Sequence, residues 1–128
     1  MTTLGSMSFL DHLSPADCER LAAEALPLRL AAGEWLVERG SPAVDVFQVG
    51  TGRFEEVDAR PTPEVIVRVL APGAVLGESA IVDASPWNHG VRAVEDGDLI
   101  RWPHEVLHRL FEADPSLGAR FFRAVSAS

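Results

Sequence analysis

Clusters of glycine and proline divide the central part of this chain into short segments, and their spacing limits its fold more than any other feature. These clusters occupy residues 32–33, 40–42 and 50–52. Between them, apolar residues such as Val44, Val46 and Val49 recur at short intervals, as in strands with one buried face. Short strands at this spacing predict a β-barrel or a β-sandwich.

A proline-rich stretch at residues 60–63 separates two further strand-like runs, Arg53 to Asp58 and Val65 to Leu70. Proline cannot donate a backbone hydrogen bond to a sheet, so it suits an exposed loop. The stretch therefore predicts the tip of a hairpin. A last strand is expected over residues 94–102.

Helices are predicted on both sides of this β region. Ser14 suits the N-cap of a helix that continues with Pro15 and Asp17. A second helix is expected to start at Pro103, and a third after Asp114. We predict one domain over residues 1–128, with a helical segment at 8–26, a β-roll at 28–102 and C-terminal helices at 103–126.

Composition excludes several classes of protein. The hydrophobic content of 47% is that of a globular domain. A formal net charge of -8 opposes binding to nucleic acid or to an anionic membrane surface. The single cysteine, Cys18, cannot form an internal disulfide, and the N-terminus has no signal-peptide pattern. With no apolar run long enough to span a membrane, we expect a cytoplasmic location and no direct membrane contact.

The run from Val75 to Ala93 reads Val-Leu-Gly-Glu-Ser-Ala-Ile-Val-Asp-Ala-Ser-Pro-Trp-Asn-His-Gly-Val-Arg-Ala. It resembles the phosphate-binding cassette of cyclic-nucleotide-binding domains, a superfamily that includes the catabolite activator protein and kinase regulatory subunits. The matching positions are Gly77, Glu78, Ala80, Pro86 and Val91. The ordered turn glycines fit the same family along nearly the whole chain.

The resemblance implies a mainly β fold with flanking helices, a double-stranded β-helix or jelly-roll-like barrel. It implies that Glu78 holds the ribose 2′-hydroxyl and that the backbone of Gly77, Ser79 and Ala80 contacts the cyclic phosphate. Trp87 and Asn88 would line the same pocket. The ligand it implies is cAMP or cGMP, with no other cofactor required.

The cassette departs from the family at one decisive position, because Trp87 stands where the family has an arginine that pairs with the phosphate. A hydrogen bond to a charged group contributes about 1.5–3 kcal/mol, and a guanidinium makes two. Trp87 stacked on a purine, or a guanidinium from Arg68 or Arg92, would offset this loss. Alternatively, the indole ring fills the pocket and leaves the cassette as scaffold only.

A second motif, His104-Glu105-Val106-Leu107-His108, matches the HExxH signature of zinc hydrolases. The sequence offers no third ligand from another helix, so the motif is interpreted as the wet face of an amphipathic helix, and no metal site is assigned. Glu55, Glu56 and Asp58 are interpreted as a solvated strand edge. No catalytic residues are assigned, and the chain is not predicted to be an enzyme.

Together these features predict a regulatory sensor domain that binds a cyclic nucleotide or related small anion weakly. It would signal through its C-terminal helices to an effector domain, in the same chain or in a partner. The alternative is a nucleotide-free interaction module that homodimerises along Leu117, Phe121 and Val125, which exposure of these apolar residues would favour. A zinc hydrolase is the distant alternative.

Overall fold

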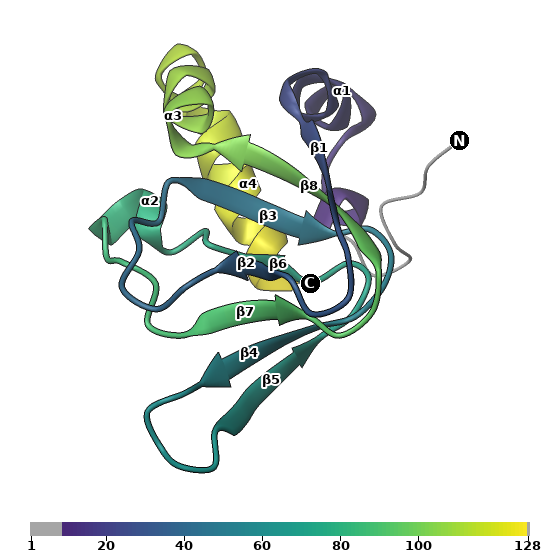
Figure 1. The fold of residues 1–128 in the computed structure, drawn as a ribbon. Helices are drawn as coiled ribbons and strands as arrows, with labels where there is room; N and C mark the ends of the chain where they lie inside the picture. The colour runs from purple at the N-terminus through teal and green to yellow at the C-terminus, as the bar shows by residue number, and fades with distance from the viewer. Residues whose placement is uncertain (1–8, 128) are drawn as a thin grey trace.

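The computed structural model describes residues 9–127 as one β-roll with helices gathered at one end (Figure 1). The elements are a 3₁₀ turn η1 Phe9–His12, α1 Pro15–Glu24, β1 Leu26–Leu30, β2 Trp35–Val37, β3 Asp45–Val49, β4 Phe54–Asp58, β5 Val65–Leu70, β6 Val75–Leu76, α2 Ala80–Asp83, β7 Gly90–Ala93, β8 Gly97–Pro103, α3 His104–Ala113 and α4 Pro115–Ala127. The expected helical segment 8–26 starts at residue 8, which lies outside the described residues.

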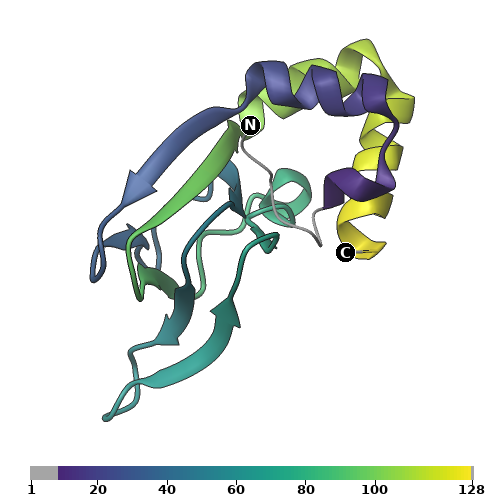
Figure 2. The ribbon, with the colours of Figure 1, turned by 90° about the vertical axis from the view of Figure 1, so that its right-hand side faces the viewer.

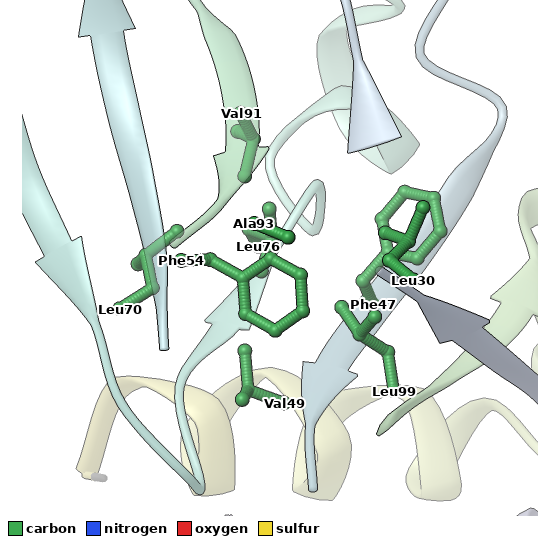
Figure 3. Close-up of a cluster of buried hydrophobic side chains, with 9 residues drawn as sticks. All are labelled: Leu30, Phe47, Val49, Phe54, Leu70, Leu76, Val91, Ala93 and Leu99. Atoms are coloured by element: carbon green, nitrogen blue, oxygen red, sulfur yellow. The ribbon is translucent and has the colours of Figure 1, made fainter. Parts of the chain in front are cut away.

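Two four-stranded antiparallel sheets form the roll, in the orders β1-β8-β3-β6 and β2-β7-β4-β5. Their inward-facing side chains meet in a core that includes Phe47, Phe54 and Leu99 (Figure 3). Because each strand is short, it is held by this core and by its neighbours together. The predicted mainly β fold with flanking helices is confirmed.

A second core joins the helices to the end of the roll. Phe9 contacts both Trp102 and Phe121 edge-on, with ring centroids 5.8 and 5.4 Å apart. The indole Nε1–H of Trp102 donates to the Leu21 carbonyl at 2.8 Å, so this buried polar group is satisfied. Figure 2 shows α1, α3 and α4 toward one end of the molecule and the β4–β5 hairpin at the other.

The stripe of Leu117, Phe121 and Val125, whose exposure would favour the interaction module, lies mostly inside the molecule. Leu117 and Phe121 are 0% exposed, and the Phe121 ring packs against Phe9 and against Phe111 of α3. Only Val125 of that stripe is partly exposed. Leu117 and Phe121 are therefore not available as a dimer contact in this fold, and homodimerisation through the C-terminal helix stays a prediction. None of the helices in residues 9–127 has the length and apolarity needed to cross a membrane.

The expected last strand, residues 94–102, is shorter at its start, since β8 begins at Gly97 and the preceding β7 ends at Ala93. Gly97 approaches the neighbouring chain so closely that a Cβ there would lie 2.6 Å from the Thr51 carbonyl oxygen. Residues 94–96 therefore turn the chain from one sheet to the other. This close packing of backbones depends on contacts distant in sequence, which strand periodicity does not reveal.

An ion pair between a buried carboxylate on α1 and a partly exposed guanidinium on α4 joins these two helices. Asp17 is only 4% exposed, and the Arg120 guanidinium donates to both of its carboxylate oxygens at 2.7 and 2.9 Å. These hydrogen bonds from Arg120 lower the pKa of Asp17 below its usual value. The predicted cap at Ser14 is also present, because its side-chain oxygen accepts from the Asp17 backbone N–H.

Arg120→Ala is expected to lower the free energy of unfolding by about 1–3 kcal/mol, because it leaves a buried carboxylate without its partner. Arg123→Ala, on the exposed face of the same helix, is the control and should change stability by less than about 0.5 kcal/mol. Urea unfolding of both variants measures the difference. Equal effects would show that the pair does not stabilise the fold.

The same pair makes stability depend on pH in a defined direction. Asp17 has a lower pKa in the folded chain than when unfolded, where it is about 3.9. Its contribution is therefore complete above about pH 4 and is lost as the pH falls through the folded-state pKa. The stability gap between wild type and Arg120→Ala should be constant near neutral pH and shrink in acid.

The residue that follows β6 is Gly77, and any side chain at this position would collide with neighbouring atoms. Gly77 has φ of 90°, and a Cβ there would clash with the Asp45 carbonyl oxygen and lie 3.2 Å from the Trp87 ring. Gly33 has nearly the same φ, 89°, but nothing lies within 4 Å of its Cβ position. The two glycines share a backbone conformation and differ in crowding.

Gly77→Ala is therefore expected to destabilise the chain by about 1–3 kcal/mol more than Gly33→Ala, the excess coming from the collision. Thermal unfolding of both variants at the same pH provides the comparison. If both lose the same stability, the backbone conformation alone is responsible and the tight contact beneath Gly77 is not present.

Candidate functional site

A cavity of about 240 Å³ opens where β6 passes into α2, beside the inner face of the β2-β7-β4-β5 sheet. Every site residue expected from the sequence lines it, namely Gly77, Glu78, Ser79, Ala80, Trp87 and Asn88. The remaining lining residues are Ala43, Glu56, Arg68, Leu76, Asp83, Ser85, Pro86 and Val91.

The local sequence explains the shape of this segment. Gly77 turns the chain out of β6, and the single turn of α2 ends where Ala84 adopts a left-handed conformation with φ of 55°. The segment then returns to the loop between β2 and β3. There the Trp87 backbone N–H donates to the Ser41 carbonyl at 3.0 Å, and the Trp87 carbonyl accepts from Gly40 at 2.8 Å. The Trp87 end of the segment is therefore held by two backbone hydrogen bonds.

Glu78 has one carboxylate oxygen that the fold leaves without a partner. Its Oε2 is buried and has no hydrogen-bond partner, although the side chain as a whole is half-buried. Leaving a buried acceptor unpaired costs about 1–3 kcal/mol, more for a charged group, so such atoms call for an explanation. A hydroxyl donated by a bound molecule in the cavity would satisfy it.

Trp87 turns its ring inward, beneath the cassette. The ring centroid lies 6.2 Å from that of Phe47, and the indole also packs beneath Gly77. The position where the family carries an arginine therefore contributes apolar surface and no positive charge. The ring occupies part of the space under the cassette, and the cavity described above remains beside it.

Three residues from neighbouring strands form one row across the inner face of the sheet. Val91 of β7 pairs with Glu56 of β4, and Glu56 pairs with Arg68 of β5. All three line the cavity. The interpretation of Glu56 as part of a solvated edge is thus wrong, because β4 lies between β7 and β5 and its register turns Glu56 inward.

Glu56 is the centre of a small polar network. The Arg68 Nε–H donates to Glu56 Oε1 at 3.1 Å, and the His89 Nδ1 atom lies 2.7 Å from Glu56 Oε2. Sequence reasoning did not place Glu56 in the site. The alternation of inward and outward residues in β4 did not indicate the inward direction of Glu56, because the register is irregular between Glu56 and Val57.

Arg68 and Arg92, the two arginines considered as substitutes for the missing one, differ in position. Only Arg68 lines the cavity. Arg92 pairs with Glu64 and Glu55 at 3.0 and 3.3 Å, and its guanidinium lies 5.1 Å from the centroid of the Trp35 ring. These hydrogen bonds, with Glu64 first, raise the pKa of Arg92 and hold it away from the cavity.

The cavity is rich in acceptors and poor in positive charge. Glu56, Glu78 and Asp83 line it together with Arg68. The Ser85 backbone N–H donates to Asp83 at 3.0 Å, which lowers the pKa of that carboxyl below its usual value. Such a lining favours a ligand with hydroxyl donors and leaves a single guanidinium to face any anionic group.

A shallower groove of about 390 Å³ adjoins the cavity. Its lining consists of Arg68, Glu78, the chain from Ala71 to Val75, and Val125 of α4. The cavity and the C-terminal helix therefore share a boundary at Glu78.

The HExxH residues do not come together as a site. His104 is buried, and its Nε2 atom lies 3.0 Å from the Gly77 carbonyl oxygen, whereas Glu105 and His108 are exposed. Within residues 9–127 no group of three or more His, Cys, Asp or Glu is arranged to hold a metal ion. The interpretation of a wholly wet helix face is wrong for His104, which instead ties the start of α3 to the cassette.

Comparison of the sequence with known proteins identifies the family. The model of the cyclic nucleotide-binding domain matches residues 27–114, more than half of the chain. An NTE family protein of Mycobacterium bovis is 30% identical over 125 residues, 98% of this chain and 21% of that protein. Acetyltransferase Pat of Mycolicibacterium smegmatis is 29% identical over 99 residues, 77% of this chain and 29% of that protein. The chain thus spans less than a third of these curated relatives.

Solved structures share the fold at low sequence identity. The N-terminal domain of a transcriptional regulator from Streptomyces coelicolor has a TM-score of 0.82 at 22% identity, covering 93% of this chain and 86% of that one. The catabolite activator protein of Thermus thermophilus has a TM-score of 0.78 at 17% identity, covering 93% of this chain and 56% of that one. The regulatory domain of Toxoplasma gondii PKA, crystallised with cAMP, has a TM-score of 0.71 at 23% identity, covering 83% of this chain and 40% of that one.

The family model, the two-sheet roll and the cassette segment agree, and the chain belongs to the cyclic nucleotide-binding domain family.

Proposed function

We propose that this domain is a sensor that binds a cyclic nucleotide weakly, with the ribose 2′-hydroxyl donating to Glu78. The buried, unpartnered Oε2 of Glu78 is the observation that carries this proposal. A ribose hydroxyl is a donor of suitable chemistry for a carboxylate, and it would remove the cost of the unpaired acceptor. cAMP and cGMP share the ribose, so this contact selects for neither base.

The phosphate would lie against the backbone that follows Glu78. Among the described residues, no acceptor pairs with the backbone N–H of Ser79 or of Ala80. Clustered free amides are suited to an anion. Gly77 contributes by the absence of a side chain, because its turn brings this backbone to the cavity.

Weak affinity follows from the charges around the cavity. Trp87 supplies no cation where the family has one, and Glu56, Glu78 and Asp83 repel an anion. The exposed side of Trp87, with Asn88, would contact the rest of the ligand. We expect affinity that is lower by about a hundredfold than in a cassette with its arginine.

Signalling would pass from the cassette to the C-terminal helices. His104 links the Gly77 carbonyl to the start of α3, and Val125 of α4 faces the groove beside Glu78. A ligand moves such helices only if it binds their two arrangements with different affinity. Ligand contacts at the Gly77–Glu78 segment would provide that difference, because this segment contacts α3 through His104 and borders the groove that Val125 of α4 also lines.

We infer that the domain serves an effector, in the same chain or a partner, in the cytoplasm. Its relatives are longer proteins, an NTE family protein and an acetyltransferase, of which it matches only a part. The second candidate is an interaction module that has lost its nucleotide. The inward ring of Trp87 favours this alternative, because it fills space under the cassette.

Calorimetric titration with cAMP and cGMP tests the proposal, with Glu78→Ala as the variant and Glu105→Gln, an exposed site on α3, as the control. Glu78→Ala should weaken binding by about tenfold or more, since a charged hydrogen bond is lost. 2′-Deoxy-cAMP should bind the wild type with a similar loss, and Glu78→Ala should lose little further with this ligand.

Trp87→Arg separates the two candidates. Under the sensor proposal the wild type binds, and Trp87→Arg binds about ten- to a hundredfold more tightly. Binding only after this substitution would favour the nucleotide-free module. Binding by neither chain at millimolar ligand would contradict the proposal that the cassette holds a nucleotide.

A further inference from the structure

We propose that Arg68 on β5 supplies the cation for the ligand's phosphate, and that Glu56, its partner in this structure, competes with the phosphate for it. This inference rests on the proposed nucleotide binding and names the residues that set its strength. It replaces the missing cassette arginine with a guanidinium from a strand outside the cassette.

The position of Arg68 is the first support. In the sheet register, Arg68 lies opposite Glu56, and Glu56 lies opposite Val91 on the other neighbouring strand. The three side chains share the inner face that borders the cavity. It is the one arginine or lysine among the lining residues of the described chain. Arg68 therefore borders the same cavity as the cassette residues, although it comes from a different strand.

The hydrogen bonding of Arg68 is the second support. Only its Nε–H donates to Glu56, and within residues 9–127 no acceptor pairs with its two Nη groups. Its side chain is 54% exposed, so it can turn without disturbing the core. A guanidinium with two free amino groups presents the paired donors that suit phosphate oxygens.

The hydrogen bond between Arg68 and Glu56 can break without leaving the Glu56 carboxylate unpaired. Its second oxygen, Oε2, lies 2.7 Å from His89 Nδ1, so the carboxylate keeps a partner when Arg68 turns away. As long as Arg68 stays on Glu56, the carboxylate offsets its charge and reduces its attraction for an anion. Affinity is then a competition between Glu56 and phosphate for one guanidinium.

Opposite effects of two substitutions test this competition. Arg68→Ala should weaken cAMP binding by about tenfold or more, because a charged hydrogen-bonding partner of the phosphate is lost. Glu56→Gln should strengthen it by about threefold or more, because the neutral amide holds Arg68 less tightly. Arg92→Ala is the matched control, since Arg92 is held by Glu55 and Glu64 away from the cavity.

The three variants and the wild type are compared by calorimetric titration with cAMP, and thermal unfolding of each confirms that it is folded. Arg68→Lys, which keeps a charge but loses the planar fork, should fall between wild type and Arg68→Ala. If Arg68→Ala does not fold, Arg68→Lys replaces it as the test of the role of Arg68.

The titrations distinguish failure of the Arg68 proposal from failure of the nucleotide-binding proposal. If the wild type binds and Arg68→Ala and Glu56→Gln behave like Arg92→Ala, the role of Arg68 is overturned while the nucleotide proposal stands. If Glu56→Gln weakens binding as Arg68→Ala does, Glu56 assists the ligand and the competition is overturned. If the wild type does not bind at millimolar cAMP, both proposals fail together.

Discussion

Packing of the inward-facing side chains between the two sheets holds this molecule together, and the cavity lies where that packing stops. Phe47 belongs to the core, and its ring neighbours Trp87, which lines the cavity. Because β6 contributes only Val75 and Leu76 before the turn at Gly77, the core gives way at once to an acceptor-rich segment. The fold and the site therefore share one boundary, and Gly77 is the residue that lies on it.

The cassette has kept its shape and changed its charge. The turn at Gly77 and the buried, unpartnered Oε2 of Glu78 suit a ribose, whereas Trp87 places an indole where the family has a guanidinium. The fold alone does not decide whether a domain of this kind binds its family's ligand. What matters is the balance of charges around the cavity, where Arg68 is bonded to Glu56 and stands among three lining carboxylates.

Local sequence predicted the parts of the site that are contiguous in the chain. Gly77 to Ala80, Trp87 and Asn88 meet at one cavity because a single segment carries them. Glu56 and Arg68 were harder to place, since their inward direction depends on strand order and on the irregular register after Glu56. His104 was misread for a similar reason, because its partner at Gly77 is distant in sequence. Periodicity reports which face a residue shares, and not which element covers that face.

The most direct test of the account is an amide NMR titration of the ¹⁵N-labelled wild-type chain with cAMP. The account predicts that the resonances of Gly77, Ser79 and Ala80 shift, and that those of α4 around Val125 shift with the same saturation, because the two regions share the groove at Glu78. Resonances unchanged at millimolar cAMP, or shifts confined to the groove between α1 and β1 near Ala22 and Leu28, would contradict it.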